Sequence, residues 1–319
     1  MEEARDAPSV EIIGETIPAL DLRYMTNSLM QRVTYIENRI CLFERLLEEK
    51  GPPVALQSLA VAVQEPSYFV GRICCDTEEG RLNPKSIMLE GSVRTSNGAR
   101  VRLDLSACPE YRLFPGQVLI VKGTNPSGFC VVASNILNGM PLPPSKQPKK
   151  HHAGNLSMLV AAGPFTAADN FAYEPLEEFL NHAAEIKVGV VLLIGPFLAE
   201  DHPLVLSGTV DETYENIVEI GFYGQLASFA QRTNGKIKIL LIPSPKDVHL
   251  DPVFPQSPFL APPYCVSLSN PATFSCNGVE MGCCSLDWLI SCSKEEIALS
   301  KEHVDRLTAI ASHTLYQRK

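Results

Sequence analysis

The sequence predicts an α+β multidomain protein with an N-terminal helix, then a small β-barrel, then an α/β sheet. Three observations support this fold class. Apolar residues recur at helical spacing between Leu22 and Leu47, short alternating segments fill residues 66–140, and apolar runs alternate with helical patterns from residue 156 onward. A chain of 319 residues has room for about two domains.

Composition sets limits on the function. With 45% hydrophobic and 20% charged residues, the chain has the make-up of a globular protein. Its net charge is −9 and its pI is about 5.3, so the molecule as a whole repels phosphate and disfavours broad non-specific nucleic-acid binding. We expect no membrane span, because no apolar run is long enough, and we predict that residues 1–19 form a disordered tail.

The first element is a long amphipathic helix predicted over residues 20–51. Lys50 is followed by Gly51, Pro52 and Pro53, which cannot continue a helix. Two interpretations are open: the apolar stripe packs on its own domain, or it is a coiled-coil seam. We favour packing on its own domain, because the stripe is short for a coiled coil. The stripe consists of Leu22, Met25, Leu29, Val33, Ile36, Ile40, Phe43 and Leu47.

Residues 66–140 are predicted to be all-β. Five short strands separated by turn residues favour a closed five-stranded barrel, for which the OB-fold is the commonest choice. OB-folds often bind single-stranded DNA through aromatic side chains, so a single-stranded DNA-binding OB protein is an alternative function. Core packing, however, explains Tyr68, Phe69 and Phe129 better than base stacking does. The predicted strands are Tyr68–Cys75, Ser86–Val93, Arg100–Leu105, Gln117–Gly123 and Gly128–Ser134.

A linker is predicted over residues 141–155. It contains PLPPSKQPKKHH, which is rich in proline and lysine and has no apolar periodicity. We therefore expect a solvated, extended tether.

Residues 156–319 are predicted to form an α/β domain. Leu156–Ala162, Val188–Ile194 and Lys236–Ile242 have the composition of buried parallel strands. Helical patterns lie between them, one beginning near Pro175 and the other running from Asp211 to Gln231. This βαβαβ order predicts a sheet covered by helices.

The carboxyl ends of these strands are where an α/β sheet binds its ligands. They read Gly163-Pro164-Phe165, Gly195-Pro196-Phe197 and Pro243-Ser244-Pro245, and glycine, proline and phenylalanine neither ligate metals nor carry protons. No nucleotide-binding glycine motif is present. We therefore predict no catalytic, cofactor-binding or metal-binding residues, and no cofactor.

One ligand-type pattern follows the third strand. Asp247, His249 and Asp251 form a D-x-H-x-D run, and hard and borderline cations use such residues. The run lies past the strand end among prolines, where loops commonly use aspartate to bond the backbone. A metal-dependent phosphoesterase built on these three residues is kept as a further alternative function.

Several motifs resemble a known family. VGRICCDTEEGRLNPKSIMLEGS (70–92) and LFPGQVLIVKGTNPSG (113–128) resemble the OB domain of the B (accessory, regulatory) subunits of DNA polymerase alpha–primase. LVAAGPFTAADNFAYEPL (159–176), LLIGPFLAEDHP (192–203) and LIPSPKDVHLDPVFPQSPF (241–259) resemble the calcineurin-like phosphoesterase domain of the same family. Compared with that family, the chain looks truncated at both ends, with an incomplete phosphoesterase-like domain.

The resemblance implies a non-catalytic scaffold. Such a protein is nuclear, holds the C-terminal zinc-bearing module of the polymerase catalytic subunit and reaches the primase subunits through the complex, in primer synthesis and the initiation of DNA replication. It also implies weak or indirect DNA contact and no membrane. Against the phosphoesterase motifs, Pro196, Ala199 and Ser244 fall at positions of metal ligands, so the resemblance implies an inactive fold.

Overall fold

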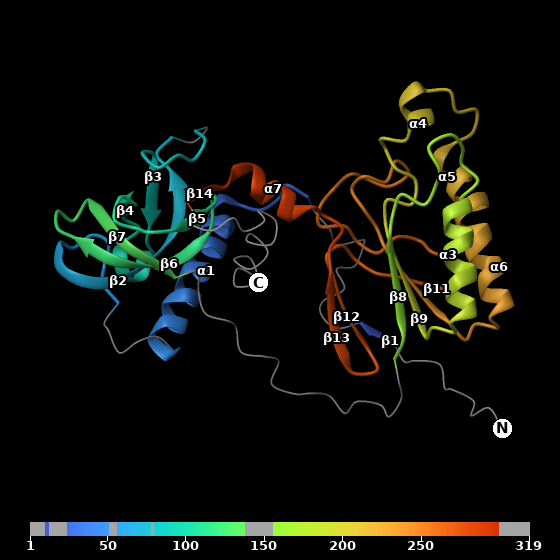
Figure 1. Ribbon diagram of the computed structural model, residues 1–319, viewed down its shortest axis with the longest axis horizontal. Coiled ribbons are helices and arrows are strands. Elements are labelled where there is room, and N and C mark those ends of the chain that lie inside the picture. The colour runs from blue at the N-terminus through green and yellow to red at the C-terminus, as the bar shows by residue number, and fades with distance from the viewer. Residues whose placement is uncertain (1–9, 13–23, 51–55, 78–79, 138–155, 300–319) are drawn as a thin grey trace. The chain divides into compact units, whose positions relative to one another are not determined.

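The computed structural model describes residues 10–12, 24–50, 56–77, 80–137 and 156–299, which divide into two compact units. The barrel unit contains the described part of residues 24–137 together with residues 287–299. The sheet unit contains residues 10–12 and 156–286 (Figure 1). No helix among the described residues is both long and apolar enough to cross a membrane.

The barrel unit contains the predicted five-stranded closed barrel. Neighbouring strands run in the order β2-β3-β4-β7-β6, antiparallel except for the parallel pair β4 and β7. Side chains alternate along each strand, so that Val101 and Leu103 point inward with Phe69 and Val131. The strands are β2 (Val63–Cys75), β3 (Ile87–Glu90), β4 (Arg100–Asp104), β6 (Val118–Asn125) and β7 (Cys130–Leu137).

Further short elements complete this unit. The short helix α2 (Val93–Ser96) joins β3 to β4, and β5 (Tyr111–Leu113) pairs antiparallel with β14 (Ile297–Leu299). Helix α7 (Trp288–Glu295) precedes β14. Residues 287–299 therefore pack with the barrel unit. This pairing joins segments far apart in the chain, which a local pattern cannot predict.

Helix α1 (Leu29–Lys50) begins nine residues after the start predicted at residue 20. Residues 20–23 lie outside the described part of the chain. The start is set by a reciprocal cap: Ser28 Oγ accepts the backbone N–H of Gln31 (3.2 Å), and Gln31 Oε1 accepts that of Ser28 (2.9 Å). The cap fixes the helix N-terminus inside the apolar stripe.

Within the described residues 24–50, the second half of the apolar stripe packs on the barrel. Ile40, Phe43 and Leu47 are buried against β2 and β6, with Ile36 partly buried beside them. Leu29, by contrast, is 79% exposed. Packing on the helix's own unit is therefore confirmed for the C-terminal half of the stripe.

A buried carboxylate also ties α1 to the barrel. The Glu44 side chain has no exposed surface and accepts hydrogen bonds from Ser92 Oγ (2.5 Å), Thr95 Oγ1 (2.6 Å) and Arg94 Nη2 (2.9 Å). Two turns earlier, Glu37 accepts the N–H of Val93 at 2.9 Å, at the start of α2. Helix α1 is thus fixed to α2 by polar contacts, in addition to its apolar packing on β2 and β6.

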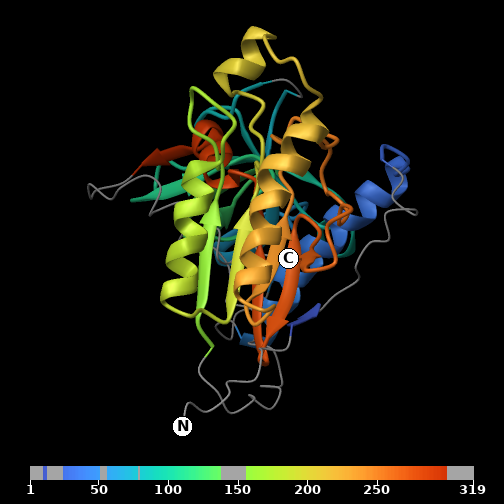
Figure 2. The ribbon, with the colours of Figure 1, turned by 90° about the vertical axis from the view of Figure 1, so that its right-hand side faces the viewer.

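The sheet unit is built on a parallel sheet with strand order β11-β10-β9-β8. This order contains the predicted βαβαβ arrangement, and Figure 2 shows α3 and α6 over one face of the sheet. Leu176 and Leu180 of α3 and Leu226 and Phe229 of α6 pack there on the strands. The elements are β8 (Met158–Ala162), α3 (Glu174–Glu185), β9 (Val190–Ile194), α6 (Gly224–Arg232), β10 (Lys238–Ile242) and β11 (Cys265–Ser267).

The helix predicted from Asp211 to Gln231 is confirmed over α5 (Tyr214–Ile217), a π-helical turn η1 (Val218–Tyr223) and α6, which follow one another without a break. A separate short helix, α4 (Pro203–Ser207), precedes them. Within η1, the Tyr173 ring lies against Gly221, where a Cβ would come within 2.7 Å of the ring. The wide turn and the glycine together make room for that ring.

A second sheet covers the other face of the parallel sheet. It has the order β1-β12-β13, with β1 (Val10–Ile12), β12 (Ala272–Cys276) and β13 (Val279–Cys283). Leu192 and Leu240 pack against Phe274 in this layer. The prediction of a disordered tail over residues 1–19 is wrong at Val10–Ile12, which form strand β1. The remainder of that tail and the predicted linker at 141–155 lie outside the described residues.

We expect Ile40→Asp to lower the free energy of unfolding of residues 1–319 by about 3–4 kcal/mol, because Ile40 is 1% exposed and the change buries an unpaired charge. Leu29→Asp on the same helix is the matched control and should change it by less than about 0.5 kcal/mol. Urea unfolding measures both. Equal losses would show that the first half of the stripe is also buried in solution.

Candidate functional site

The carboxyl edge of the parallel sheet is the edge at which α/β folds bind their ligands. Strands β8 and β9 each end there in a Gly-Pro pair, Gly163-Pro164 and Gly195-Pro196, with cis peptide bonds. A Cβ on Gly163 would collide with the carbonyl oxygen of Pro196, and one on Gly195 would collide with Asp247 Oδ2. The two loops are therefore packed too closely to admit side chains at these positions.

Asp247 is buried at this edge and bonds the backbone. Its Oδ1 accepts the N–H groups of Phe197 and Leu198 (3.1 Å to Leu198), and its Oδ2 accepts that of Ser244 (3.0 Å). Burial raises the pKa of Asp247 to about 7, against the opposing effect of these three N–H donors. The carboxylate thus joins the loop after β9 to the loop after β10.

His249 lies next to Asp247 but has no hydrogen bond. Its Nδ1 is 3.9 Å from Asp247 Oδ1, its side chain is 8% exposed, and neither ring nitrogen has a partner in the described part of the chain. Burial lowers its pKa to about 4. The imidazole is therefore neutral at pH 7.

Asp251, the third residue of the D-x-H-x-D run, does not lie with Asp247 and His249. Asp251 is exposed, and its carbonyl oxygen accepts a hydrogen bond from Gln256 Nε2 (3.2 Å). Over the described ranges, no group of three or more His, Cys, Asp or Glu residues could hold a metal ion. The structure brings together Asp247 and His249 and leaves Asp251 outside.

His202 lies in the loop after β9, and its ring also bonds the backbone. Its Nδ1 accepts the N–H of Leu204 (3.2 Å), which caps α4. Its Nε2 is therefore protonated and donates to the carbonyl of Ala167, 2.8 Å away. The ring joins the loop after β8 to the loop after β9.

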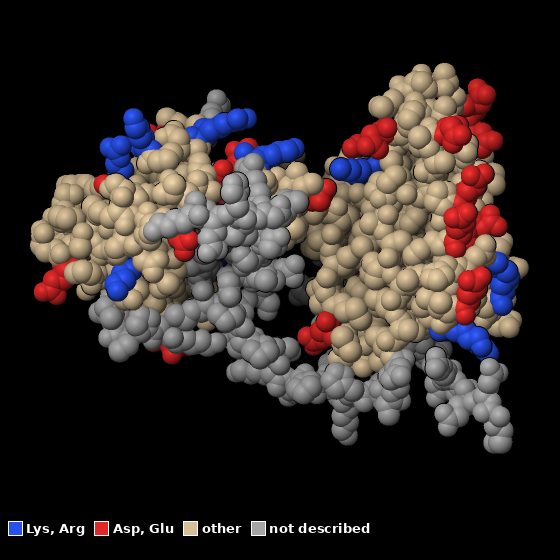
Figure 3. Space-filling view, viewed as in Figure 1, with Lys and Arg blue, Asp and Glu red and all other residues tan. Residues whose placement is uncertain are grey.

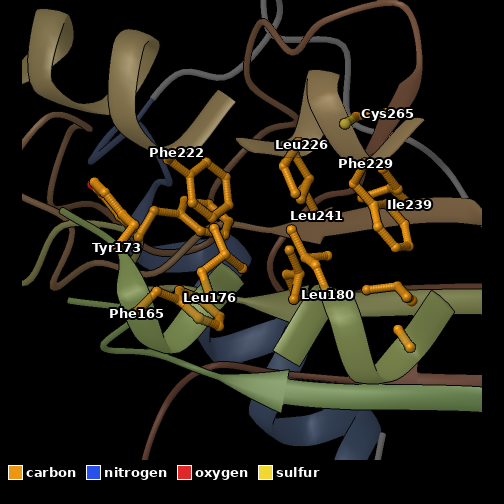
Figure 4. Close-up of a cluster of buried hydrophobic side chains, with 14 of the residues drawn as sticks. Phe165, Tyr173, Leu176, Leu180, Phe222, Leu226, Phe229, Ile239, Leu241 and Cys265 are labelled. Atoms are coloured by element: carbon orange, nitrogen blue, oxygen red, sulfur yellow. The ribbon is translucent and has the colours of Figure 1, made fainter. Parts of the chain in front are cut away.

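Aromatic side chains fill the space beside the strand ends. The Phe197 ring lies 4.7 Å from that of Phe222 and 6.2 Å from that of Phe165, measured between centroids. Figure 4 shows Phe165, Tyr173 and Phe222 in this cluster. Tyr173 is wholly buried, has a left-handed backbone (φ 57°) and has no partner for its hydroxyl within the described residues. The sequence did not single it out, because no local pattern marks such a residue.

In the barrel, the three aromatic residues considered for DNA stacking have different surroundings. Phe69 is in the barrel core and Tyr68 is half-buried, with Lys122 Nζ 5.9 Å from its ring centroid. Phe129 is 80% exposed, so the expectation that it packs in the core is wrong. It lies in the turn between β6 and β7, where alternation gives no guide to burial. Stacking platforms for single strands use successive aromatics, and of these three residues Phe129 alone is fully exposed.

Comparison with known families matches both units. Residues 158–319 match the family of DNA polymerase alpha/epsilon B subunits, and residues 34–139 match the family described as the OB domain of the DNA polymerase alpha B subunit. The fold and the first match together define an accessory-subunit class of protein, and the chain belongs to the family of DNA polymerase alpha/epsilon B subunits. The OB-domain match and the relatives below are both of the alpha type.

Relatives that are themselves B subunits of DNA polymerase alpha support this assignment. The Bos taurus protein is 35% identical over 97% of this chain and 52% of its own length, and the Mus musculus protein is 32% identical over 97% and 52%. The Schizosaccharomyces pombe protein is 32% identical over 98% of this chain and 58% of its own length. The chain thus spans about half the length of the curated relatives it matches.

We expect Asp247→Ala to lower the free energy of unfolding by about 3 kcal/mol, because it leaves the three buried N–H groups of Phe197, Leu198 and Ser244 without an acceptor. Asp251→Ala, at an exposed position, is the control and should cost less than about 0.5 kcal/mol. Urea unfolding at pH 7 measures both. If the two variants unfold alike, Asp247 does not join the loops in solution.

His249 should make stability depend on pH. In the unfolded chain its pKa is near the ordinary 6.5, while burial holds it at about 4 in the folded protein. Between these values the unfolded chain binds more protons, so folded stability falls as pH falls. We expect wild type to lose about 2 kcal/mol more than His249→Gln between pH 7 and pH 5.

Asp247 gives the opposite slope, since its raised pKa makes stability increase as pH falls through about 7. It is present in wild type and in His249→Gln, so comparing the two proteins at each pH isolates His249. His182→Gln, at an exposed position on α3, is the control for the loss of a surface imidazole. Parallel profiles for wild type and His249→Gln would contradict the burial of a neutral imidazole.

Proposed function

We propose that this chain is a non-catalytic regulatory and scaffold subunit of DNA polymerase alpha–primase, acting in the nucleus during primer synthesis and the initiation of DNA replication. In this role it binds the C-terminal module of the polymerase catalytic subunit and meets the primase subunits through the complex. Family membership and the similarity to B subunits of DNA polymerase alpha support the proposal.

The proposal that the chain is non-catalytic rests on the hydrogen bonds of Asp247. Hydrolysis by a two-metal site needs carboxylates and imidazoles free to hold ions about 3.5–4 Å apart. Asp247 instead gives both oxygens to backbone N–H groups, and Asp251 is exposed away from it. The neighbouring strand ends carry Pro196, Ala199 and Ser244, at positions where the resemblance to calcineurin-like phosphoesterases implies ligands. An inactive phosphoesterase fold is the interpretation that fits these side chains.

Direct DNA binding has a minor part in this proposal. The net charge of −9 opposes phosphate at long range. The exposed Phe129 offers one ring for stacking, and a single ring gives little affinity for a strand. Contact with DNA is therefore expected to be weak or to occur through the other subunits.

The test uses residues 1–319 in two assays. In a pull-down, the chain should bind the isolated C-terminal module of the catalytic subunit, while the same module unfolded by a zinc chelator serves as the control. In a hydrolysis assay with bis(p-nitrophenyl) phosphate and added manganese, wild type and His249→Gln should both match the rate in buffer. Turnover that His249→Gln abolishes would establish the phosphoesterase alternative, and failure to bind the folded module would reject the scaffold role for this chain.

A further inference from the structure

Strands β3 and β4 present basic side chains to solvent. On β4, Val101 and Leu103 point into the barrel, so the exposed Arg100 and Arg102 point outward. β3 and β4 are the second and third strands of the closed barrel, and in OB-folds these two strands form the face that binds oligonucleotides. Figure 3 shows Lys and Arg side chains gathered on the barrel unit in the region of β3. The position of the face and the sign of these charges both point to a ligand that carries phosphate.

The cations of this face outnumber its carboxylates. Glu90 on β3 accepts hydrogen bonds from Arg72 Nε (2.8 Å) and Arg100 Nε (2.8 Å), so two arginines share one carboxylate. Asp104 lies at the end of β4, where the exposed Arg102 offsets its charge. Distant acidic residues are screened beyond about 8–10 Å at physiological salt, so the net charge of −9 does not decide what happens at this face.

Arg102 connects the two borders of the face. Its backbone N–H donates to the carbonyl oxygen of Phe129 (3.0 Å), in the turn between β6 and β7. Its Nη2 donates to the carbonyl oxygen of the exposed Lys85 (3.0 Å), in the loop between β2 and β3. In OB-folds these two connections contribute to binding together with the face. A guanidinium has five N–H donors and the bond to Lys85 uses one, so Arg102 has the donors that a phosphate requires.

The exposed ring of Phe129 supplies an apolar contact at one border. Core packing does not account for this ring, because the side chain is exposed to solvent. Aromatic rings beside cations stack on unpaired bases and so bind single strands. A duplex keeps its bases paired and stacked, and an acidic peptide has no base to offer. The ring and the cations together therefore favour a single strand of nucleic acid over other anions.

We propose that the outward face of β3 and β4 binds a short single strand of nucleic acid. Arg102 and Lys85 would contact phosphates, and Phe129 would stack on one base. The contact is weak, because one ring and few cations take part and because Glu78 and Glu79, in the loop before β3, oppose phosphate. The inference deepens the proposed function and rests on it for the choice of ligand, since it gives the weak DNA contact a defined place.

The experiment titrates residues 1–319 into fluorescein-labelled oligothymidine and oligouridine of about ten nucleotides, with fluorescence anisotropy as the readout. At about 50 mM salt we expect a Kd of about 10 µM, which weakens about seven-fold at about 200 mM salt for two phosphate contacts. Binding of either oligonucleotide supports the site, and the tighter one identifies the ligand. No saturable binding up to about 300 µM protein, or equal affinity for a duplex or an oligoglutamate peptide, would overturn the proposal.

Two double variants that remove the same charge locate the phosphate contacts. Lys85→Gln with Arg102→Gln should weaken binding about ten-fold at about 50 mM salt and make it less dependent on salt. The control is Arg32→Gln with Arg45→Gln, two exposed arginines on α1, which should change the affinity less than about two-fold. Equal weakening by the two pairs would reject a site on this face. Urea unfolding checks that each variant keeps its fold.

Phe129→Ala separates stacking from charge. It should weaken binding about ten-fold and leave the salt dependence unchanged, because stacking releases no counterions. An unchanged affinity in this variant would reject the single-strand site, since the ring is what distinguishes a strand from other anions. If no oligonucleotide binds while the polymerase module still binds in the pull-down, this face alone is rejected. The scaffold role is rejected only when binding of the module fails.

Discussion

The sheet unit depends on one buried carboxylate. Asp247 takes the N–H groups of Phe197, Leu198 and Ser244, and so holds the loops that leave β9 and β10. Isolated charges are expensive to bury, and here the hydrogen bonds offset part of that cost while burial still raises the pKa. The same geometry requires glycine at position 195, because a Cβ there would collide with Asp247 Oδ2. This contact fixes the backbone at Phe197 and Leu198 to the loop after β10, and His249 lies beside it.

The barrel unit uses a second buried carboxylate in a different way. Glu44 is wholly enclosed, but Arg94 lies 2.9 Å away and supplies a compensating charge, and two hydroxyls complete its partners. Removing Arg94, whose side chain is half-exposed, would leave the enclosed Glu44 carboxylate without its compensating charge. Asp247 and Glu44 have the residue type expected of catalysis or metal binding, yet each connects segments distant in sequence. Acidic residues in a chain of this kind are therefore weak evidence for chemistry until their partners are known.

Those partners also decide how much could be predicted from the sequence. Strands and barrel were predictable because alternation and apolar runs are local signals, as at Val101 and Leu103. The start of α1 was misplaced because the apolar stripe continues before Leu29, and the deciding signal was the weaker Ser28–Gln31 cap. The pairing of β14 with β5 and the fit of Tyr173 against Gly221 join segments far apart, and no local pattern encodes them. For the site, the sequence correctly placed Asp247 as a loop residue bonding the backbone, but it could not show that His249 lacks partners.

Asp247 and His249 are neighbours in the loop after β10, but the fold satisfies their hydrogen-bonding groups to different degrees. A carboxylate only accepts hydrogen bonds, and closely packed loops offer many N–H donors, so Asp247 is satisfied within the fold. A neutral imidazole needs a donor and an acceptor in fixed directions, and in the described structure the loops provide neither to His249. Both ring nitrogens are enclosed, and Nδ1 lies 3.9 Å from Asp247 Oδ1, so the missing hydrogen bonds lie inside the fold. Residue types that could ligate a metal can therefore meet in one loop for structural reasons, and over the described residues they form no metal cluster.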